Sequence, residues 1–251
     1  MPVDDPAQPK PPSLVDTIYE GLWNDIVYGV LEAGQSLDEV ALVKRFDSSR
    51  TPLREAIARL SGDGLVVQHR NRGAYVSEIR VNELSAFLEA LHLMQRVVTR
   101  LAAQRWTEPD MVALRAAAMT YETQAQANDP RIALELDQAF HFCIASIARN
   151  SYIENLYRKL LVWQMRIFLL HARGKNWNDP ELATQLEQSV SEHQALLNAI
   201  ENRALDAAEK LGGEHIRLIR KQVLAFTSSE IVVSIRSVTE AAASPSPLEK
   251  A

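Results

Sequence analysis

The sequence contains a single cysteine, Cys143, so no disulfide bond can form within the chain. Disulfides are frequent in secreted proteins and rare in reducing compartments, and this cysteine count favours a cytoplasmic location. No apolar run approaches the roughly 18 residues of a membrane span, because Gln164 and Arg166 interrupt the longest stretch. The first residues, MPVDDPAQPKPPS, lack the apolar segment of a signal peptide. We therefore expect neither secretion nor membrane insertion.

Basic residues are fewer than acidic residues overall, but they are concentrated in one segment. The chain has a net charge of −5, which gives no general attraction for nucleic acid. Between Val40 and Gly73, however, seven basic residues stand against three acidic ones, a local net charge of +4. A basic segment on an acidic chain indicates either a phosphate-facing surface or a solvated helix face.

Hydrophobic periodicity and turn residues predict short elements in this N-terminal part. The predicted elements are a proline-rich disordered arm (1–13), a helix from Leu14 to near Gly29, a helix from its cap Ser36 to Phe46, a helix from its cap Ser49 to Gly62, and strands 65–67 and 74–76 around a tip at 70–73. Three short helices followed by a β-hairpin are typical of a winged helix-turn-helix, whose third helix enters the major groove of DNA.

The third predicted helix and the hairpin tip carry residues suited to DNA. Guanidinium groups make bidentate contacts with guanine, and hydroxyls and helix N-terminal amides bind phosphate. A winged helix used only for protein contacts is the alternative, but it does not need a basic recognition helix. The candidate DNA-contacting residues are Ser49, Arg50, Thr51, Arg54, Arg70, Arg72 and Gly73.

The same segment resembles the N-terminal domain of the GntR family of transcriptional regulators, over about Leu14–Ser77. The matching stretches are Ser49-Arg50-Thr51-Pro52, Arg54-Glu55-Ala56, Leu60, Gly64-Leu65 and Arg72-Gly73-Ala74-Tyr75-Val76. The DNA contacts that the resemblance implies are those of Ser49, Arg50, Thr51, Arg54 and Gly73. Some relatives carry an arginine in the second helix where this chain has Val40, and Lys44 or Arg45 is the expected substitute.

The rest of the chain, from Val81 to about Phe226, reads as long amphipathic helices separated by helix-start and helix-stop signals. About six helices of 17–26 residues result, which predicts an all-α bundle and a mostly α fold for the whole chain. The predicted domains are the arm (1–13), a DNA-binding domain (14–79), a helical domain (80–228) and a C-terminal tail (229–251).

Polar residues interrupt the apolar stripes of three of these predicted helices. Asp137 and His141 are four residues apart and therefore adjacent on one helix face, while His193 and His215 lie in the stripes of the last two helices. Burying a carboxylate and three imidazoles is costly unless something pairs with them. Asp and His are ordinary ligands of zinc, nickel and manganese. We therefore predict one divalent ion bound by these four residues.

Two other interpretations of the four residues remain. The histidines could be buried and hydrogen-bonded without an ion, or the bundle could be a metal-dependent enzyme. Di-iron enzymes of this type use Glu-x-x-His pairs, and none includes His141, His193 or His215. The sequence also has no phosphate-binding loop, no dinucleotide-binding glycine motif and no arrangement of nucleophile and base. An enzyme is therefore the weaker alternative.

The residues of the helical part also resemble the FCD ligand-binding domain of the FadR subgroup, over about Val81–Phe226. The matches are Asp137-x-x-x-His141, Asn150, Glu192-His193 and His215-Ile216. In metal-binding members of that domain an Asp and three His hold the ion, and a small effector, often a carboxylate, completes its shell. Many members place Arg and Glu at the positions of Leu91 and Gln95, and this departure favours a less acidic or larger effector.

Together these features predict a sequence-specific transcriptional repressor that is controlled by a small-molecule effector bound next to the metal. The expected partners are double-stranded DNA with a palindromic operator, the effector and a second copy of the chain. A metal-sensing regulator is the alternative. The candidate effector-contacting residues are Gln95, Trp163 and Arg166, with packing as the alternative role of Trp163 and solvent exposure as that of Arg166.

Overall fold

The computed structural model describes residues 12–124, 130–172 and 180–227, and the chain divides into two compact units after Glu78. The predicted tail, and the predicted arm apart from Pro12 and Ser13, lie outside the described residues. The elements are α1 (Leu14–Val27), β1 (Ser36–Leu37), α2 (Glu39–Arg45), α3 (Arg50–Gly62), β2 (Val66–His69), β3 (Gly73–Val76), the 3-10 turn η1 (Val81–Glu83), α4 (Leu84–Arg105), α5 (Glu108–Gln124), α6 (Pro130–Ile147), α7 (Ser151–Ala172), α8 (Pro180–Glu201) and α9 (Leu205–Thr227).

The N-terminal unit is a winged helix-turn-helix, as predicted. Helix α1 packs against α3, and apolar side chains at helical spacing on both helices form its core, among them Ile18, Leu22 and Leu53 with no exposed surface. The three strands form an antiparallel sheet in the order β1-β3-β2. At the wing tip the amide of Arg72 donates to the carbonyl of His69, 3.1 Å away. Gly73 there has a φ of +86°, a conformation that favours glycine.

Two details of the predicted elements are wrong. Ser36 does not cap α2 but begins β1, where it pairs with Tyr75. Asp38 caps the helix instead, since its carboxylate accepts hydrogen bonds from the amides of Val40 and Ala41 at 2.8 and 3.2 Å. Ser49 does stand at the N-cap position of α3, but its side chain makes no capping hydrogen bond.

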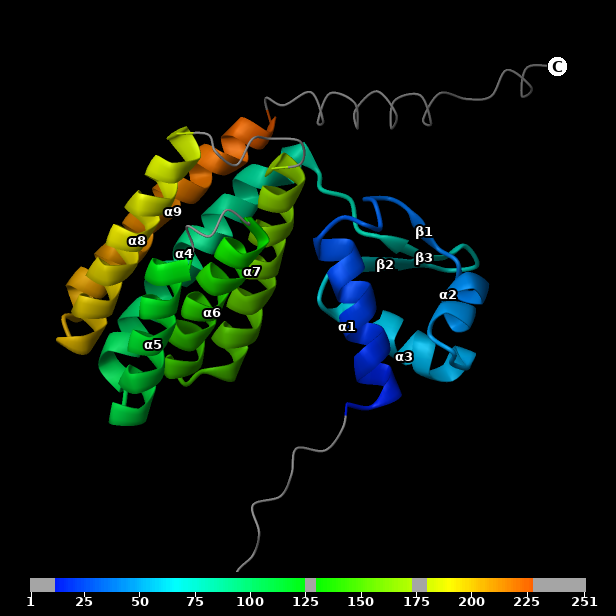
Figure 1. Cartoon of the computed structure of the whole chain (residues 1–251), viewed down its shortest axis with the longest axis horizontal. Helices are drawn as coiled ribbons and strands as arrows, with labels where there is room; N and C mark the ends of the chain where they lie inside the picture. Colours follow the sequence, from blue (N-terminus) through cyan, green and yellow to red (C-terminus); the bar gives the residue numbers. More distant parts are fainter. Residues whose placement is uncertain (1–11, 125–129, 173–179, 228–251) are drawn as a thin grey trace, which may run out of the picture. The chain divides into compact units, whose positions relative to one another are not determined.

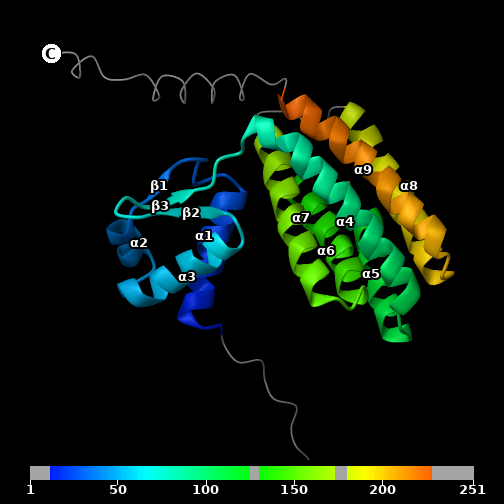
Figure 2. The same ribbon diagram turned by 180° about the vertical axis from the view of Figure 1, so that it is seen from behind.

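The C-terminal unit is an all-α bundle, and its six α-helices in the described residues confirm the predicted architecture. Figures 1 and 2 show α8 and α9 side by side at one edge of the bundle and α6 and α7 toward the other, with α4 between the two pairs. Accordingly, α4 packs against α6, α7, α8 and α9. The core of the bundle therefore forms around α4, and side chains from α6, α8 and α9 can meet inside it.

Close packing of α9 on α4 depends on glycine. A Cβ atom at Gly212 would lie 2.5 Å from the hydroxyl oxygen of Thr99 and 3.1 Å from the carbonyl oxygen of Gln95. A glycine inside a helix costs about 0.5–1 kcal/mol relative to alanine, so this position trades helix stability for a close approach. The approach brings the next turn of α9, which carries His215, against the interior of the bundle. Among the described helices none is long and apolar enough to cross a membrane.

Candidate metal centre and nucleic-acid interface

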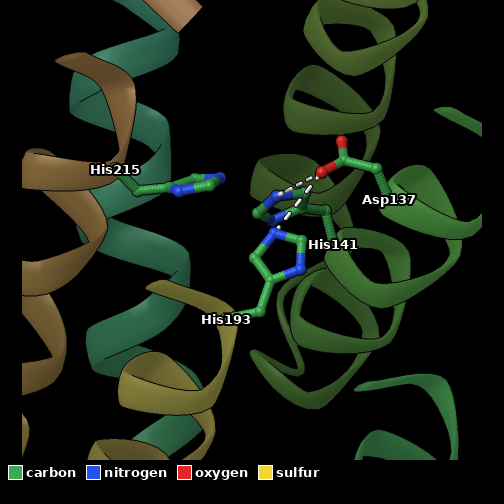
Figure 3. A group of neighbouring side chains, drawn as sticks. All are labelled: Asp137, His141, His193 and His215. Carbon is green, nitrogen blue, oxygen red and sulfur yellow. Dashed lines mark ion pairs between the residues drawn. The ribbon is translucent and has the colours of Figure 1, made fainter. Parts of the chain in front are cut away.

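Four side chains from three helices meet inside the bundle. Helix α6 supplies Asp137 and His141, α8 supplies His193 and α9 supplies His215, and Figure 3 shows all four pointing toward one another. One potential ligand atom from each lies within 4.8 Å of the others. The centroids of the three imidazole rings are 5.0–5.1 Å apart. This is a donor set of one oxygen and three nitrogens around one point.

Burial keeps the cluster in the protonation state that a metal requires. His141 and His193 are each 1% exposed, and burial lowers the pKa of both imidazoles below the usual value. Burial alone would raise the pKa of Asp137, but the neighbouring imidazoles outweigh it and lower this pKa to about 2. At neutral pH the carboxylate of Asp137 is therefore ionised and the imidazoles of His141 and His193 are neutral, the forms that bind divalent ions.

The protein leaves some atoms of the cluster without hydrogen bonds. Within the described residues, Nε2 of His141 and both ring nitrogens of His193 have no hydrogen-bond partner. Oδ1 of Asp137 lies 3.8 Å from Nε2 of His141 and 3.4 Å from Nε2 of His193. Buried polar atoms are normally satisfied, and an ion between these atoms would satisfy them. The residues present thus fit a metal ion.

Each of the three imidazole rings makes a different contact with residues outside the cluster. Nδ1 of His215 lies 2.6 Å from a carboxylate oxygen of Glu192. Nδ1 of His141 lies 3.3 Å from the hydroxyl of Tyr157 and 3.4 Å from the side-chain nitrogen of Gln95. The ring of His193 stacks on Phe140 with centroids 4.3 Å apart. The three rings are therefore oriented by a carboxylate, a hydroxyl–amide pair and an aromatic face, respectively.

The N-terminal unit presents the predicted DNA-contacting residues on its surface. Two of them are also paired within the unit: Arg54 donates two hydrogen bonds to Oε2 of Glu39 at 3.0 and 3.1 Å, and Arg45 forms a bidentate ion pair with Asp25. The exposed residues of this group are Ser49, Arg50, Thr51 and Arg54 at the start of α3, Arg45 at the end of α2, and Arg70, Arg72 and Gly73 at the wing.

Comparison with known families assigns both units. Residues 14–76 match the model described as bacterial regulatory proteins, gntR family, and residues 86–218 match that of the FCD domain. The chain is a GntR-family transcriptional regulator with an FCD domain, the arrangement of the FadR subfamily.

Relatives of this GntR-family regulator are themselves named as regulators. The Nta operon transcriptional regulator of Aminobacter aminovorans is 28% identical over 51% of this chain and 60% of its own length. The transcriptional repressor RspR of Escherichia coli is 27% identical over 82% of this chain and 87% of its own. The Glc operon transcriptional activator of Escherichia coli is 24% identical over 84% and 89%. These relatives are regulators and not enzymes.

A solved structure shares the fold of this GntR-family regulator. It is described as E. coli McbR/YncC, covers 86% of this chain and 97% of its own, and has a TM-score of 0.70 at 17% sequence identity. At that identity the likeness supports the fold alone.

The three predicted effector-contacting residues of this regulator lie in different surroundings. Gln95 is 1% exposed and accepts a hydrogen bond from Tyr157, so it belongs to the wall of the Asp/His cluster. Arg166 is also 1% exposed, so solvent exposure is wrong for it, and burial lowers its pKa to about 10. Its guanidinium lies 5.3 Å over the half-buried ring of Trp163. Nine residues separate Arg166 from Tyr157, so the two point to opposite sides of α7.

Sequence reasoning missed two residues of the site in this regulator, Glu192 and Tyr157. Glu192 directly precedes His193 but contacts His215, 23 residues away, across the α8–α9 pair. Tyr157 comes from α7, a helix on which no part of the metal cluster was expected. The only signal for Glu192 was its place in the Glu192-His193 match to the FCD domain, and Tyr157 had none.

Proposed function

We propose that this protein is a repressor that binds a palindromic operator as a homodimer, and that a small-molecule effector bound beside a divalent ion controls its affinity for DNA. The observation that carries the proposal is the buried cluster of Asp137, His141, His193 and His215 within the FCD domain. When bound, zinc, nickel or manganese would supply a positive charge with coordination positions left for an effector. Gln95, in the wall of the cluster, is the best placed of the three candidate effector contacts.

The DNA contacts are proposed for the N-terminal end of α3 and for the wing. Arg50 is the first residue of α3, exposed, and charged next to a helix N-terminus whose amides can bind phosphate. In a winged helix-turn-helix this end of the recognition helix reaches the base edges. Arg54 lies one turn further along and is held by Glu39, which limits its side-chain freedom. A guanidinium that is held in place loses less entropy when it binds a base.

Replacing Arg50 by alanine should relax the discrimination of one base pair. The loss expected is about 1–3 kcal/mol for the preferred base at that position, because one bidentate contact disappears. The measurement is a fluorescence-anisotropy titration of an operator selected from random duplexes, with each position then varied. Arg220→Ala, which removes an exposed arginine of α9, is the matched control. Unchanged discrimination at every position would refute the role of Arg50.

The same titration should reach saturation at two chains per palindrome, and one chain per site would refute the dimer.

Effector binding should lower the affinity of the metal-loaded protein for its operator. Coupling of this kind amounts to about 1–3 kcal/mol and is reciprocal, so operator DNA should weaken effector binding by the same factor. Metabolites that raise the melting temperature of the metal-loaded protein provide the effectors to be tested. An effector that tightens operator binding would refute the proposal that the effector releases the protein from its operator. Both modes of regulation occur among the named relatives, which include a repressor and an activator. A change in operator affinity with metal alone would favour the metal-sensing alternative.

A further inference from the structure

We infer that Glu192 and the Tyr157–Gln95 pair are positioning residues of the metal site, which orient His215 and His141 so that Nε2 of each imidazole faces the ion. The inference rests on the proposed metal site and adds an outer shell to its four ligands. Outer-shell partners fix the tautomer and the ring orientation of ligating histidines in metalloproteins generally. Two separate sets of contacts support it here, one on α8 and one on α7 and α4.

The contact between Glu192 and His215 determines which nitrogen is protonated. An ionised carboxylate only accepts hydrogen bonds. At neutral pH the carboxylate therefore requires a hydrogen on Nδ1 of His215, 2.6 Å away. In the neutral form, which a metal ligand must adopt, the imidazole has one N–H, so Nε2 of His215 then carries the lone pair.

The contacts of His141 lead to the same tautomer by a neutral route. The hydroxyl of Tyr157 donates its hydrogen to the side-chain oxygen of Gln95, so its own oxygen remains as an acceptor. Nδ1 of His141, 3.3 Å from that oxygen, is then the donor. Nε2 of His141 consequently presents its lone pair to Asp137, 3.8 Å away. The side-chain nitrogen of Gln95 is itself a donor, and at 3.4 Å from Nδ1 of His141 it lies beyond the usual hydrogen-bond range, so Gln95 acts on His141 through Tyr157.

This arrangement favours a cation over a cluster joined only by hydrogen bonds. Nε2 of His141 and of His215 would carry lone pairs, and the carboxylate of Asp137 is likewise an acceptor, so acceptors face acceptors in a buried space. Without a positive charge such a set is repulsive, and a divalent ion makes it attractive. Glu192 adds a negative charge outside the ligand shell and would strengthen electron donation from His215 to an ion. The neutral hydroxyl of Tyr157 has no such effect on His141.

The surroundings of Glu192 leave it accessible. Its side chain is 27% exposed, and together with His215 it lines a pocket of about 410 Å³ between α8 and α9. The amide of Gln188, one turn earlier on α8, donates to its other carboxylate oxygen at 2.7 Å. Glutamine at position 192 would occupy the same space, so the folded structure should tolerate Glu192→Gln. Tyr157→Phe likewise removes a single oxygen atom.

Zinc affinity of the full-length protein tests the inference. Glu192→Gln should weaken zinc binding by about 10–100-fold in competition with a chelating dye, and Tyr157→Phe by a factor toward the lower end of that range. The matched controls are Glu187→Gln, exposed on the same helix as Glu192, and Tyr152→Phe, which is 85% exposed on the same helix as Tyr157. Both controls should bind zinc like the parent protein. Parent affinity in both Glu192→Gln and Tyr157→Phe would overturn the inference.

Imidazole nitrogen NMR shifts provide a readout that a merely structural role would not move. In the metal-free parent, His141 and His215 should both carry their hydrogen on Nδ1. Glu192→Gln should alter the spectrum of His215 alone, and Tyr157→Phe that of His141 alone. Weaker zinc binding with both tautomers unchanged would refute positioning. If the parent binds no zinc, the proposed metal function fails, while the tautomers of the metal-free protein still decide whether these residues orient the rings.

Discussion

Replacing His193 by alanine should leave the protein without stoichiometric metal. His193 sits between the α6 ligands and His215, with its Nε2 atom 3.4 Å from Asp137 and its ring centroid 5.0 Å from those of both other histidines. Removing it takes away one of the four potential ligands and leaves a cavity beside Phe140, on which its ring stacks. The measurement is elemental analysis after loading with zinc, nickel or manganese and removal of free metal. The parent should retain one ion per chain.

The controls for this experiment separate loss of metal from loss of fold. His92→Ala removes a half-buried histidine of α4 outside the cluster and should leave the metal content unchanged. His215→Ala should give the same result as His193→Ala from a different helix. Circular dichroism establishes that each variant retains its helices, and DNA binding tests the N-terminal unit separately. One ion per chain in both His193→Ala and His215→Ala would mean that the ion is bound elsewhere in the protein.

The sequence predicts the fold well because both units depend on local patterns. Apolar residues at helical spacing and the signals between helices define six long helices, and the recognition helix begins where Ser49 predicts. The failure at Ser36 has a physical reason. A strand of two residues, Ser36–Leu37, has no periodicity to detect, and its pairing partner Tyr75 lies 39 residues away. Ser36, which precedes α2 by three residues, therefore resembles the N-cap of that helix in the sequence.

The metal cluster was predictable for a different reason, namely that its residues interrupt apolar stripes. Their positions in the apolar stripes of three helices predict that Asp137, His193 and His215 point into the bundle, and the structure brings them together. It does not state which outer residue meets which ring. Glu192 reaches His215 only because α8 and α9 pair in one register, and Tyr157 reaches His141 only because α7 packs beside α6. Such contacts follow from helix pairing, which a single sequence does not reveal.

The second large effect concerns stability: zinc should stabilise the C-terminal unit against unfolding without affecting the N-terminal unit. An ion that binds only the folded state adds about 4 kcal/mol when its free concentration is 1,000 times its dissociation constant. The cluster joins α6, α8 and α9, helices separated by long stretches of sequence, so unfolding the bundle disperses the ligands. Urea denaturation with and without a chelator measures the difference. In the described residues Trp23 is the only tryptophan of the N-terminal unit, whereas Trp106 and Trp163 lie in the other.

These tryptophans allow the two units to be followed separately. In Trp23→Phe, fluorescence should report the C-terminal unit, and its midpoint should rise with zinc and fall when the chelator removes it. In a variant that retains Trp23 as its only tryptophan, the midpoint should not depend on zinc.

Asp137→Asn keeps the volume of the side chain but removes the negative charge, so its C-terminal unit should lose most of the zinc dependence. Magnesium should have little effect on the parent, because it prefers octahedral oxygen ligands over imidazole. An equal shift of both units would show that zinc acts outside the cluster, and no shift with zinc bound would mean that the unfolded chain binds it equally well.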